Sequence, residues 1–262
     1  MEEYLHIALQ AALDAGREII SIYESGDFDV DFKADHSPLT RADLASHNVI
    51  SRHLLKTGIP LLSEEGKHLP YSERKNWTRL WIVDPIDGTK EFIKKNGDFT
   101  VNIALIDNSI PVLGVIYVPV HSEMYYSTNE QGAFKAVCPL DTEVTEILAR
   151  GEKLPFAKSD RPYTVVASLS HMSPETENYI NELKVEHGQI ESISRGSSLK
   201  LCMVAEGSAD CYPRFAPTME WDTAAGQAIC MHAGFDVIDW ETQQTMRYNR
   251  ENLLNNWFTV SP

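Results

Sequence analysis

Two aspartates follow a run of apolar residues that has the length and composition of a buried strand. The run covers residues 80–83, and Asp84 and Asp87 come directly after it, separated by one proline and one isoleucine. Carboxylates at the end of a strand suit a hard cation, because Mg²⁺ prefers oxygen ligands and is usually shared between one or two carboxylates and a substrate phosphate. The spacing of Asp84 and Asp87 therefore predicts a magnesium site.

The residues after this pair favour an anion at the same place. Gly88 lets the backbone approach an anion closely, and Thr89 offers an amide and a hydroxyl near the start of a helix. The alternative is an ordinary strand-to-turn junction that Asp, Pro and Gly shape. That alternative leaves unexplained why two acids follow a buried strand, so a site for a metal and a phosphate is the stronger interpretation.

Further acids stand at comparable places, and each has a structural explanation of its own. Glu64 and Glu65 follow another short apolar strand, although surface glutamates are usually only solvated. Asp222 directly precedes a predicted helix and suits its N-cap, and Asp43 fits the last position of a capping box that begins at Thr40. Together with the turn explanation of Asp84 and Asp87, these explanations need four separate coincidences. One shared site accounts for all of these acids at once.

The remaining pattern indicates which elements position these acids. Helical spacing and capping residues predict helices over residues 4–23, 40–57, 174–185, 198–206 and 223–233. Short apolar runs bounded by turn residues predict strands at residues 61–62, 80–83, 101–106, 112–118 and 163–168. Residues 141–161 mix charges with proline and glycine and are the best candidate for a boundary between two halves. The mixed order favours a layered α+β or α/β architecture.

Composition and charge narrow the possible partners. The 262 residues, 43% of them hydrophobic, suffice for a globular protein with a sizeable core. The formal net charge of −15, from 38 acidic against 23 basic side chains, argues against a nucleic acid polymer as partner. The start of the chain has no signal-peptide pattern, no apolar run reaches transmembrane length, and the four cysteines form no CxxC pair. We expect buried free thiols and a cytoplasmic location.

Two motifs resemble the paired signatures of the inositol monophosphatase superfamily, the segment 84–89 (Asp-Pro-Ile-Asp-Gly-Thr) and the segment 221–225 (Trp-Asp-Thr-Ala-Ala). The resemblance spans nearly the whole chain, because segments 37–43, 63–65 and 196–200 fall in the expected order. Segments 84–92 and 199–214 look most like the bacterial CysQ type, the 3'(2'),5'-bisphosphate nucleotidases.

The resemblance implies a fold and a setting for the chain. The fold is α+β, a layered α-β-α-β-α sandwich of the inositol monophosphatase and fructose-1,6-bisphosphatase type. An N-terminal half, residues 1–150, would carry most metal ligands, and a C-terminal half, residues 151–262, would carry Asp222 and the nucleotide contacts within one catalytic unit. A monomer or homodimer is implied, located in the cytoplasm or at the inner face of the cell membrane.

The resemblance also assigns roles to the acids. It implies that about two or three Mg²⁺ ions are held by four carboxylates and one backbone carbonyl, those of Glu64, Asp84, Asp87, Asp222 and Ile86. Catalysis would involve Asp43, Thr89 and Glu64, with Thr89 and Asp43 orienting or deprotonating the attacking water. The substrate phosphate would contact this same group, namely Glu64, Ile86, Asp87, Gly88, Thr89 and Asp222. Inhibition by lithium is a further implication.

The substrate implied is adenosine 3',5'-bisphosphate, a by-product of sulfate assimilation, which would lose its 3'-phosphate to give AMP. Inositol monophosphatases typically have an acid where this chain has Arg214, and arginine suits a second phosphate better. Ser198 and Lys200 are further candidates for nucleotide contact. The alternatives are that the segment around Ser198 is an ordinary helix start and that Arg214 pairs with a surface acid.

Other functions stay open. One is an inositol monophosphatase or another small-metabolite phosphatase of the same superfamily. A second is a protein that binds metal or nucleotide without catalysis. A phosphatase of the haloacid dehalogenase type is disfavoured, because Asp84 and Asp87 are three positions apart instead of two, and that type's late pair of adjacent aspartates is absent.

Overall fold

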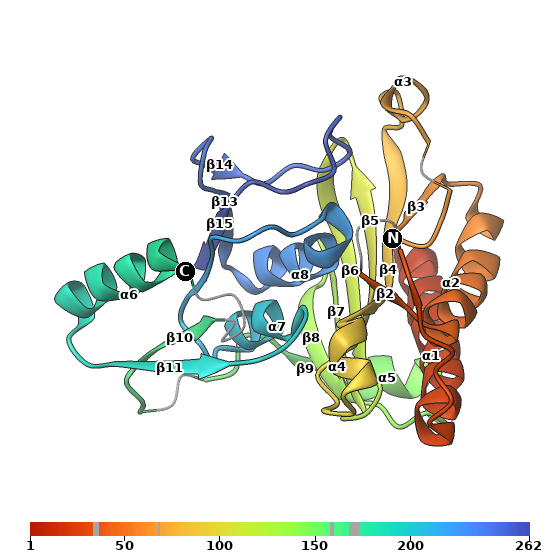
Figure 1. Cartoon of the computed structure of the whole chain (residues 1–262), viewed down its shortest axis with the longest axis horizontal. Coiled ribbons are helices and arrows are strands. Elements are labelled where there is room, and N and C mark those ends of the chain that lie inside the picture. Colours follow the sequence, from red (N-terminus) through yellow and green to blue (C-terminus); the bar gives the residue numbers. More distant parts are fainter. Residues whose placement is uncertain (34–36, 68, 158–159, 168–172) are drawn as a thin grey trace.

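The computed structural model describes residues 1–262 apart from 34–36, 68, 158–159 and 168–172. Helices and sheets alternate in five layers (Figure 1). From one side to the other these are a helix pair, a large sheet, a second helix pair, a smaller set of strands, and one outer helix. The predicted α-β-α-β-α sandwich is therefore confirmed.

The first layer consists of α1 (Glu2–Ser25) and α2 (Arg41–Leu54), which pack side by side on one face of the large sheet. α1 ends where Gly26 adopts a left-handed conformation with φ 73°. Thr40 caps α2, and the predicted capping box with Asp43 is present. A 3₁₀ turn, η1 (Leu55–Thr57), continues α2. Two short antiparallel strands, β1 (Asp31–Phe32) and β2 (Pro38–Leu39), precede α2 in the chain.

The large sheet has seven strands in chain order: β3 (Leu61–Ser63), β4 (Arg79–Asp87), β5 (Thr100–Asp107), β6 (Ile110–Val118), β7 (Glu123–Thr128), β8 (Gly132–Val137) and β9 (Glu152–Lys153). β3 and β4 are parallel, and the other neighbours are antiparallel. Helices cover both faces, which is why the central strands are almost continuously apolar. Three short helices, α3 (Tyr71–Arg74), α4 (Thr89–Ile93) and α5 (Val144–Arg150), lie in the connections.

The middle layer consists of α7 (Leu199–Glu206) and α8 (Glu220–Ala233). α8 lies against the large sheet, and small residues let it approach closely. A Cβ atom added to Gly114 of β6 would lie 2.4 Å from the backbone oxygen of Ala225 in α8. Gly234 ends α8 with φ 96°. This packing fixes the start of α8 beside the end of β4.

The fourth layer holds a sheet in the order β12 (Tyr212–Arg214), β15 (Phe258–Ser261), β13 (Asp236–Asp239) and β14 (Gln244–Thr245). The parallel pair β10 (Tyr163–Ala167) and β11 (Ile190–Ser194) joins it through a bridge between Val165 and Cys211. The outer helix is α6 (Pro174–His187), which begins at the predicted residue, Pro174.

The predicted helices and strands are all present, with ends that shift by a few residues. Ser168, the last residue of one predicted strand, lies outside the described residues. The sequence did not indicate β7, β8 or the strands of the C-terminal sheet, although all four cysteines are free and buried as expected. None of the described helices is long and apolar enough to span a membrane. The division at residues 150 and 151 stays a prediction.

Candidate active site

The end of β4 carries the first two candidate metal ligands. β4 and β5 pair regularly up to Asp84 and again at Asp87, and one extra residue of β4 bulges out between these positions. Asp84 is buried, and its Oδ1 accepts a hydrogen bond from the amide of Ile86 at 3.1 Å. The hydroxyl of Ser46 in α2 donates to the carbonyl of Pro85 at 2.8 Å. These two hydrogen bonds hold the bulge in one conformation. The bulge interrupts the regular β4–β5 pairing between Asp84 and Asp87.

Gly88 makes the turn from β4 into α4. Its φ is 95°, a conformation that other residues rarely adopt, and an added Cβ atom would lie 3.0 Å from the carbonyl oxygen of Asp98. Thr89 is the first residue of α4, so its amide is among those at the helix N-terminus that have no partner within the helix. The glycine turn and the helix start predicted at Gly88 and Thr89 are therefore present, and phosphate binding there stays a prediction.

Thr89 and Asp43 meet across two elements. The Thr89 hydroxyl donates to Oδ1 of Asp43 at 3.2 Å and lies 3.3 Å from the carbonyl of Ile86. The other oxygen of Asp43, Oδ2, accepts from the amide and the hydroxyl of Thr40 at 2.7 and 2.6 Å. Asp43 is 2% exposed, and its burial raises the pKa of its carboxyl. Asp43 therefore both closes the cap of α2 and faces the phosphate turn.

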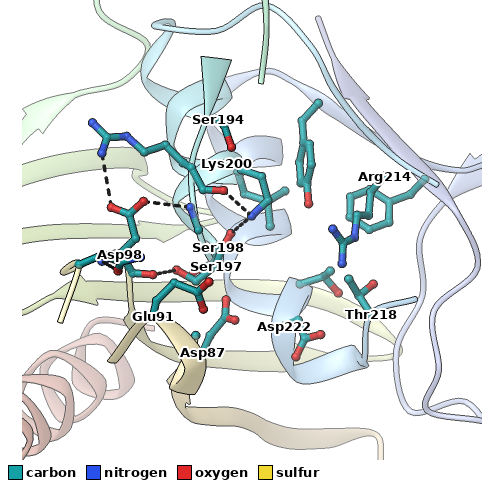
Figure 2. Close-up of a pocket in the computed structure, with 18 of the residues that line it drawn as sticks. Asp87, Glu91, Asp98, Ser194, Ser197, Ser198, Lys200, Arg214, Thr218 and Asp222 are labelled. Carbon is teal, nitrogen blue, oxygen red and sulfur yellow. Dashed lines mark hydrogen bonds and ion pairs between the residues drawn. The ribbon is translucent and has the colours of Figure 1, made fainter. Parts of the chain in front are cut away.

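Asp222 reaches the same place from the middle layer. It lies in the first turn of α8, inside the helix, and its Oδ2 accepts from the amide of Met219 at 2.8 Å. The expectation that Asp222 precedes the helix as its N-cap was wrong. α8 begins two residues earlier, at Glu220, and its N-cap is Met219. The Asp222 carboxylate lies beside Asp87, and both residues line the same cleft (Figure 2).

Glu64 follows β3 at the neighbouring strand end, where its amide donates to the carbonyl of Val83 at 3.1 Å. Its carboxylate accepts from the Lys33 ammonium at 2.7 Å, and Lys33 also bonds to Glu65. Burial by itself would lower the pKa of Lys33, but Glu64 and Glu65 together raise it above its ordinary value. Lys33 thus supplies a positive charge at the edge of the acidic cluster.

The donor chemistry of this cluster fits Mg²⁺. Burial raises the pKa of Asp84, Asp87 and Asp222, and the charges of neighbouring carboxylates raise each of them further. Among the described residues, no group of three or more His, Cys, Asp or Glu side chains is arranged to hold a metal ion as it stands. Magnesium keeps several waters, so each ion needs only one or two of these carboxylates. A cation would also relieve the repulsion between them.

A cleft of about 380 Å³ opens beside the acids. Asp87 and Asp222 line one side of it. The Lys200 ammonium faces the same space from the start of α7, and the Arg214 guanidinium faces it from β12 (Figure 2). Lys200 is 5% exposed, and its ammonium donates to the carbonyls of Arg195 and Ser197 at 3.2 and 2.6 Å. Burial lowers the pKa of Lys200 to about 8. Negative and positive groups therefore occupy different parts of one cleft.

Arg214 has capacity left for an anion. One of its terminal nitrogens, Nη2, donates to the carbonyl of Pro217 at 3.1 Å, whereas its Nε is buried and has no hydrogen-bond partner among the described residues. A guanidinium carries five N–H donors, and the bond to Pro217 uses one of them, so others can serve an anion in the cleft. None of the ion pairs in the described part of the chain involves Arg214, although its charge acts on Asp222 and opposes the rise that burial gives to the pKa of that carboxyl.

The side chain of Ser198 forms hydrogen bonds within the protein. Its hydroxyl is buried and bonds to Thr100 and Asn102 at 2.7 and 2.8 Å. Its backbone amide donates to the carboxylate of Asp87. Ser198 lines the cleft, but its side chain joins the start of α7 to β5. Its contact with a nucleotide stays a prediction.

Some residues that hold these groups in place give little signal in the sequence. Asn102 is buried in β5, and its amide lies 3.5 Å from Oδ2 of Asp87. Lys33 bonds to the glutamates, and Asp98 contacts the segment before Lys200. A polar residue inside the apolar run 101–106 was the one available signal, and it pointed to Asn102.

Comparison with known proteins agrees with this geometry. The family model described as the inositol monophosphatase family matches residues 1–259. The chain belongs to the inositol monophosphatase family. Among curated relatives, "3'(2'),5'-bisphosphate nucleotidase CysQ" of Shigella flexneri is 46% identical and that of Escherichia coli K12 is 45% identical, each over 96% of this chain and 97% of the relative. The haloacid dehalogenase alternative is thereby excluded.

Solved structures give the same result. CysQ from Bacteroides thetaiotaomicron, described as a bacterial member of the inositol monophosphatase family, has a TM-score of 0.90 and 51% identity. The match covers 99% of this chain and 97% of that chain. An inositol monophosphatase from Thermotoga maritima has a TM-score of 0.75 at 22% identity and shows the shared fold.

Proposed function

We propose that this inositol monophosphatase family member is a magnesium-dependent 3'(2'),5'-bisphosphate nucleotidase, which hydrolyses the 3'-phosphate of adenosine 3',5'-bisphosphate to give AMP and phosphate. The observation that carries the proposal is the division of one cleft into an acidic part, at Asp87 and Asp222, and a basic part, at Lys200 and Arg214. A substrate with two phosphates matches this division. The names of the relatives at 46% identity support the same substrate class.

The acidic part would hold the cofactor. Glu64, Asp84, Asp87, Asp222 and the carbonyl of Ile86 are the proposed ligands of about two or three Mg²⁺ ions. When bound, these ions supply positive charge that polarises the ester phosphate and stabilises the leaving oxygen. They also give a bisphosphate a local attraction that outweighs the distant field of a chain with net charge −15.

Thr89 and Asp43 would activate the attacking water. The water donates a hydrogen bond to the Thr89 hydroxyl, which in turn donates to Oδ1 of Asp43 at 3.2 Å. Burial raises the pKa of Asp43, which makes it a stronger base than a solvated carboxylate. The water oxygen forms a bond to the 3'-phosphorus and its proton passes toward Asp43. The ester bond breaks, and the ribose oxygen takes a proton from solvent.

The turn after β4 would hold the reacting phosphate. The amides of Gly88 and Thr89 are at the N-terminus of α4, where backbone N–H groups and the helix dipole favour an anion. Hydrogen bonds from these amides strengthen as charge builds up on the phosphate oxygens. The turn therefore both binds the phosphate and stabilises its transition state.

The basic part would hold the second phosphate. Arg214 has a buried Nε without a partner among the described residues, and Lys200 places its ammonium on the same side of the cleft. The two cations match the negative charge of a phosphate, which the hydroxyls of an inositol ring do not carry. The substrate would thus be a small-molecule bisphosphate nucleotide, which places the enzyme in sulfur metabolism.

The remaining assignments are part of the same proposal. Residues 1–150 would supply most metal ligands, and residues 151–262 would supply Asp222, Lys200 and Arg214. A monomer or a homodimer in the cytoplasm or at the inner face of the cell membrane is the expected state. A nucleic acid polymer does not fit a cleft of about 380 Å³ in a chain with net charge −15.

The test compares two substrates and two arginine variants. Phosphate release from adenosine 3',5'-bisphosphate and from inositol 1-phosphate is measured with magnesium for the wild type, Arg214→Ala and the control Arg247→Ala. Arg247 is exposed and lies outside the cleft. We expect wild type to prefer the bisphosphate. Arg214→Ala should lower kcat/KM for the bisphosphate by about tenfold to hundredfold, because one charge-assisted hydrogen bond is lost. Arg247→Ala should leave kcat/KM unchanged.

The outcomes separate the parts of the proposal. A wild-type preference for inositol 1-phosphate would refute the nucleotidase and leave the family's other phosphatase activity. Preference for the bisphosphate with an unchanged Arg214→Ala would refute the placement of the second phosphate alone. Absence of phosphate release from either substrate would favour a binding protein without catalysis.

A further inference from the structure

We infer that Asp98 is a positioning residue for this reaction, because it joins the phosphate-binding turn at Gly88 to the segment that holds Lys200. The inference rests on the proposed function of the cleft. Asp98 lies in the connection between α4 and β5, next to the acidic part of the cleft. The segment in question is residues 195–200, which lead into α7 and belong to the other half of the chain. We call it the 195–200 segment.

Hydrogen bonds from the 195–200 segment end on both the side chain and the backbone of Asp98. The amide of Gly196 donates to Oδ2 at 3.1 Å, and the Arg195 guanidinium donates to Oδ1 at 3.4 Å. The Ser197 hydroxyl donates to the backbone carbonyl of Asp98 at 3.0 Å (Figure 2). Asn96 in turn fixes Asp98, because its Oδ1 accepts from the Asp98 amide at 3.0 Å.

Two glycines bring the backbones into contact at the same carbonyl. A Cβ atom added to Gly88 would lie 3.0 Å from the carbonyl oxygen of Asp98, and one added to Gly196 would lie 2.8 Å from it. At Gly196 this distance is shorter than Cβ atoms show in folded proteins, and at Gly88 it is tighter than an ordinary contact. The carbonyl of Asp98 therefore lies in close contact with both the phosphate turn and the 195–200 segment.

The contacts of Asp98 fix groups that the proposed reaction uses. Arg195 and Ser197, which bond to Asp98, supply the two carbonyls that accept from the Lys200 ammonium. Ser197 has φ 40°, a left-handed conformation that is unfavourable for serine, so its bond to Asp98 offsets part of that cost. Loss of the Asp98 carboxylate would remove the bond from the Gly196 amide, which lies between these two carbonyls in the chain, while the bond from Ser197 to the Asp98 backbone would remain. The two carbonyls would then be held less firmly, and the ammonium would shift within the cleft.

A surface ion pair with Arg195 is the competing explanation of Asp98. The Arg195 side chain is 52% exposed, and His121, 43% exposed, lies 4.0 Å from the same oxygen. Exposed pairs of this kind contribute little to stability. The buried-side contacts, the Gly196 amide and the Ser197 hydroxyl, are therefore the ones that should matter. Arg195→Ala, which removes the ion pair alone, distinguishes the two explanations.

The experiment measures binding and turnover separately. AMP, which carries the second phosphate, is titrated by calorimetry without added metal, and KM and kcat are measured with adenosine 3',5'-bisphosphate and magnesium. The variants are Asp98→Ala, Asp98→Asn, Gly196→Ala and Arg195→Ala. The matched control is Asp107→Ala, because Asp107 lies at the other end of β5 from Asp98 and pairs with Arg79 outside the cleft.

We expect Asp98→Ala to weaken AMP binding and to raise KM by about tenfold each, the effect of one lost charge-assisted hydrogen bond. The change in kcat should stay below about threefold, because Asp87 keeps its place in β4. Asp98→Asn should recover most of the affinity, since its amide oxygen still accepts from Gly196. Gly196→Ala should reproduce the rise in KM with the carboxylate intact, and Arg195→Ala should resemble the control.

Several results would overturn the inference. Asp98→Ala with the AMP affinity and KM of Asp107→Ala would do so, and so would an Arg195→Ala variant that loses as much as Asp98→Ala. If Asp98→Ala does not fold, an unchanged KM in folded Gly196→Ala counts against the inference and a raised KM supports it. A wild type that neither binds AMP nor hydrolyses the bisphosphate refutes the proposed function itself.

Discussion

Asp43→Asn is the substitution that most directly tests how the attacking water is activated. Asp43 uses Oδ2 for the amide and hydroxyl of Thr40 and Oδ1 for the hydroxyl of Thr89. An asparagine can place its one oxygen at Thr40, where two donors need it, and its NH₂ group then faces Thr89. The Thr89 hydroxyl keeps the carbonyl of Ile86 as its acceptor, 3.3 Å away, and loses the carboxylate. The helix cap survives while the base is removed.

The expected magnitudes differ strongly between turnover and stability. Loss of a positioned general base lowers kcat by about 10²-fold to 10⁴-fold, which corresponds to about 3–5 kcal/mol in the barrier. Stability should fall by about 1–2 kcal/mol, because one hydrogen bond to a charged, buried acceptor is lost and the cap bonds remain. In a chain of 262 residues this lowers Tm by roughly 2–6 °C.

The assay is phosphate release at saturating magnesium and bisphosphate, together with thermal unfolding of the same samples. Thr40→Ala is the matched control, since it weakens the same cap by about 0.5–2 kcal/mol but leaves Asp43 and Thr89 in contact. Thr89→Val and the double variant Asp43→Asn/Thr89→Val complete a double-mutant cycle, which tests whether the losses in kcat are additive. If the two residues act as a unit, the double variant should be no slower than the slower single variant.

Asp43→Asn with kcat within about threefold of wild type, at full folding, would refute the role of Asp43 as base. Fully additive losses in the cycle would show that Thr89 and Asp43 act independently. A Thr40→Ala variant as slow as Asp43→Asn would mean that the cap geometry, and not the carboxylate, controls the rate.

Three further predictions concern the metal and the stability of the fold. Asp87→Asn should abolish turnover and weaken magnesium binding in calorimetry at an almost unchanged Tm, because it removes a ligand charge without changing volume; normal activity at saturating magnesium would contradict this. Lithium should inhibit by competing at one magnesium position, and calcium should support poor turnover because its coordination is looser; full activity in a large excess of lithium would count against it. Burial lowers the pKa of His232 to about 4, whereas the pKa of this histidine in the unfolded chain is about 6.5. Below about pH 6.5 the unfolded chain therefore binds the proton first, and the free energy of unfolding falls as the pH decreases toward 4. Between about pH 7.5 and pH 5 the wild type should lose up to about 2 kcal/mol that His232→Asn retains in urea unfolding, and equal losses in both proteins would show that another group is responsible.

The sequence by itself determined the local features of the site. Asp84, Asp87, Gly88 and Thr89 are neighbours in the chain, so their spacing showed that they converge at the end of β4 and the start of α4. The capping box of Thr40 and Asp43 was equally readable, since its hydrogen bonds join residues three positions apart. Helix and strand periodicities extend over short windows and reflect which face is buried, which is why the main elements could be predicted.

The tertiary structure alone decided which distant residues meet. Packing of α8 against β4, β5 and β6 brings Asp222 to Asp87, and its register inside α8 could not be read from the motif. The same holds for the bonds between Lys33 and Glu64 and between Asp98 and the 195–200 segment. These contacts depend on strand order and on the close approach of layers at small residues, which no local pattern encodes. The separation of one cleft into an acidic and a basic part is therefore a property of the fold and not of any motif.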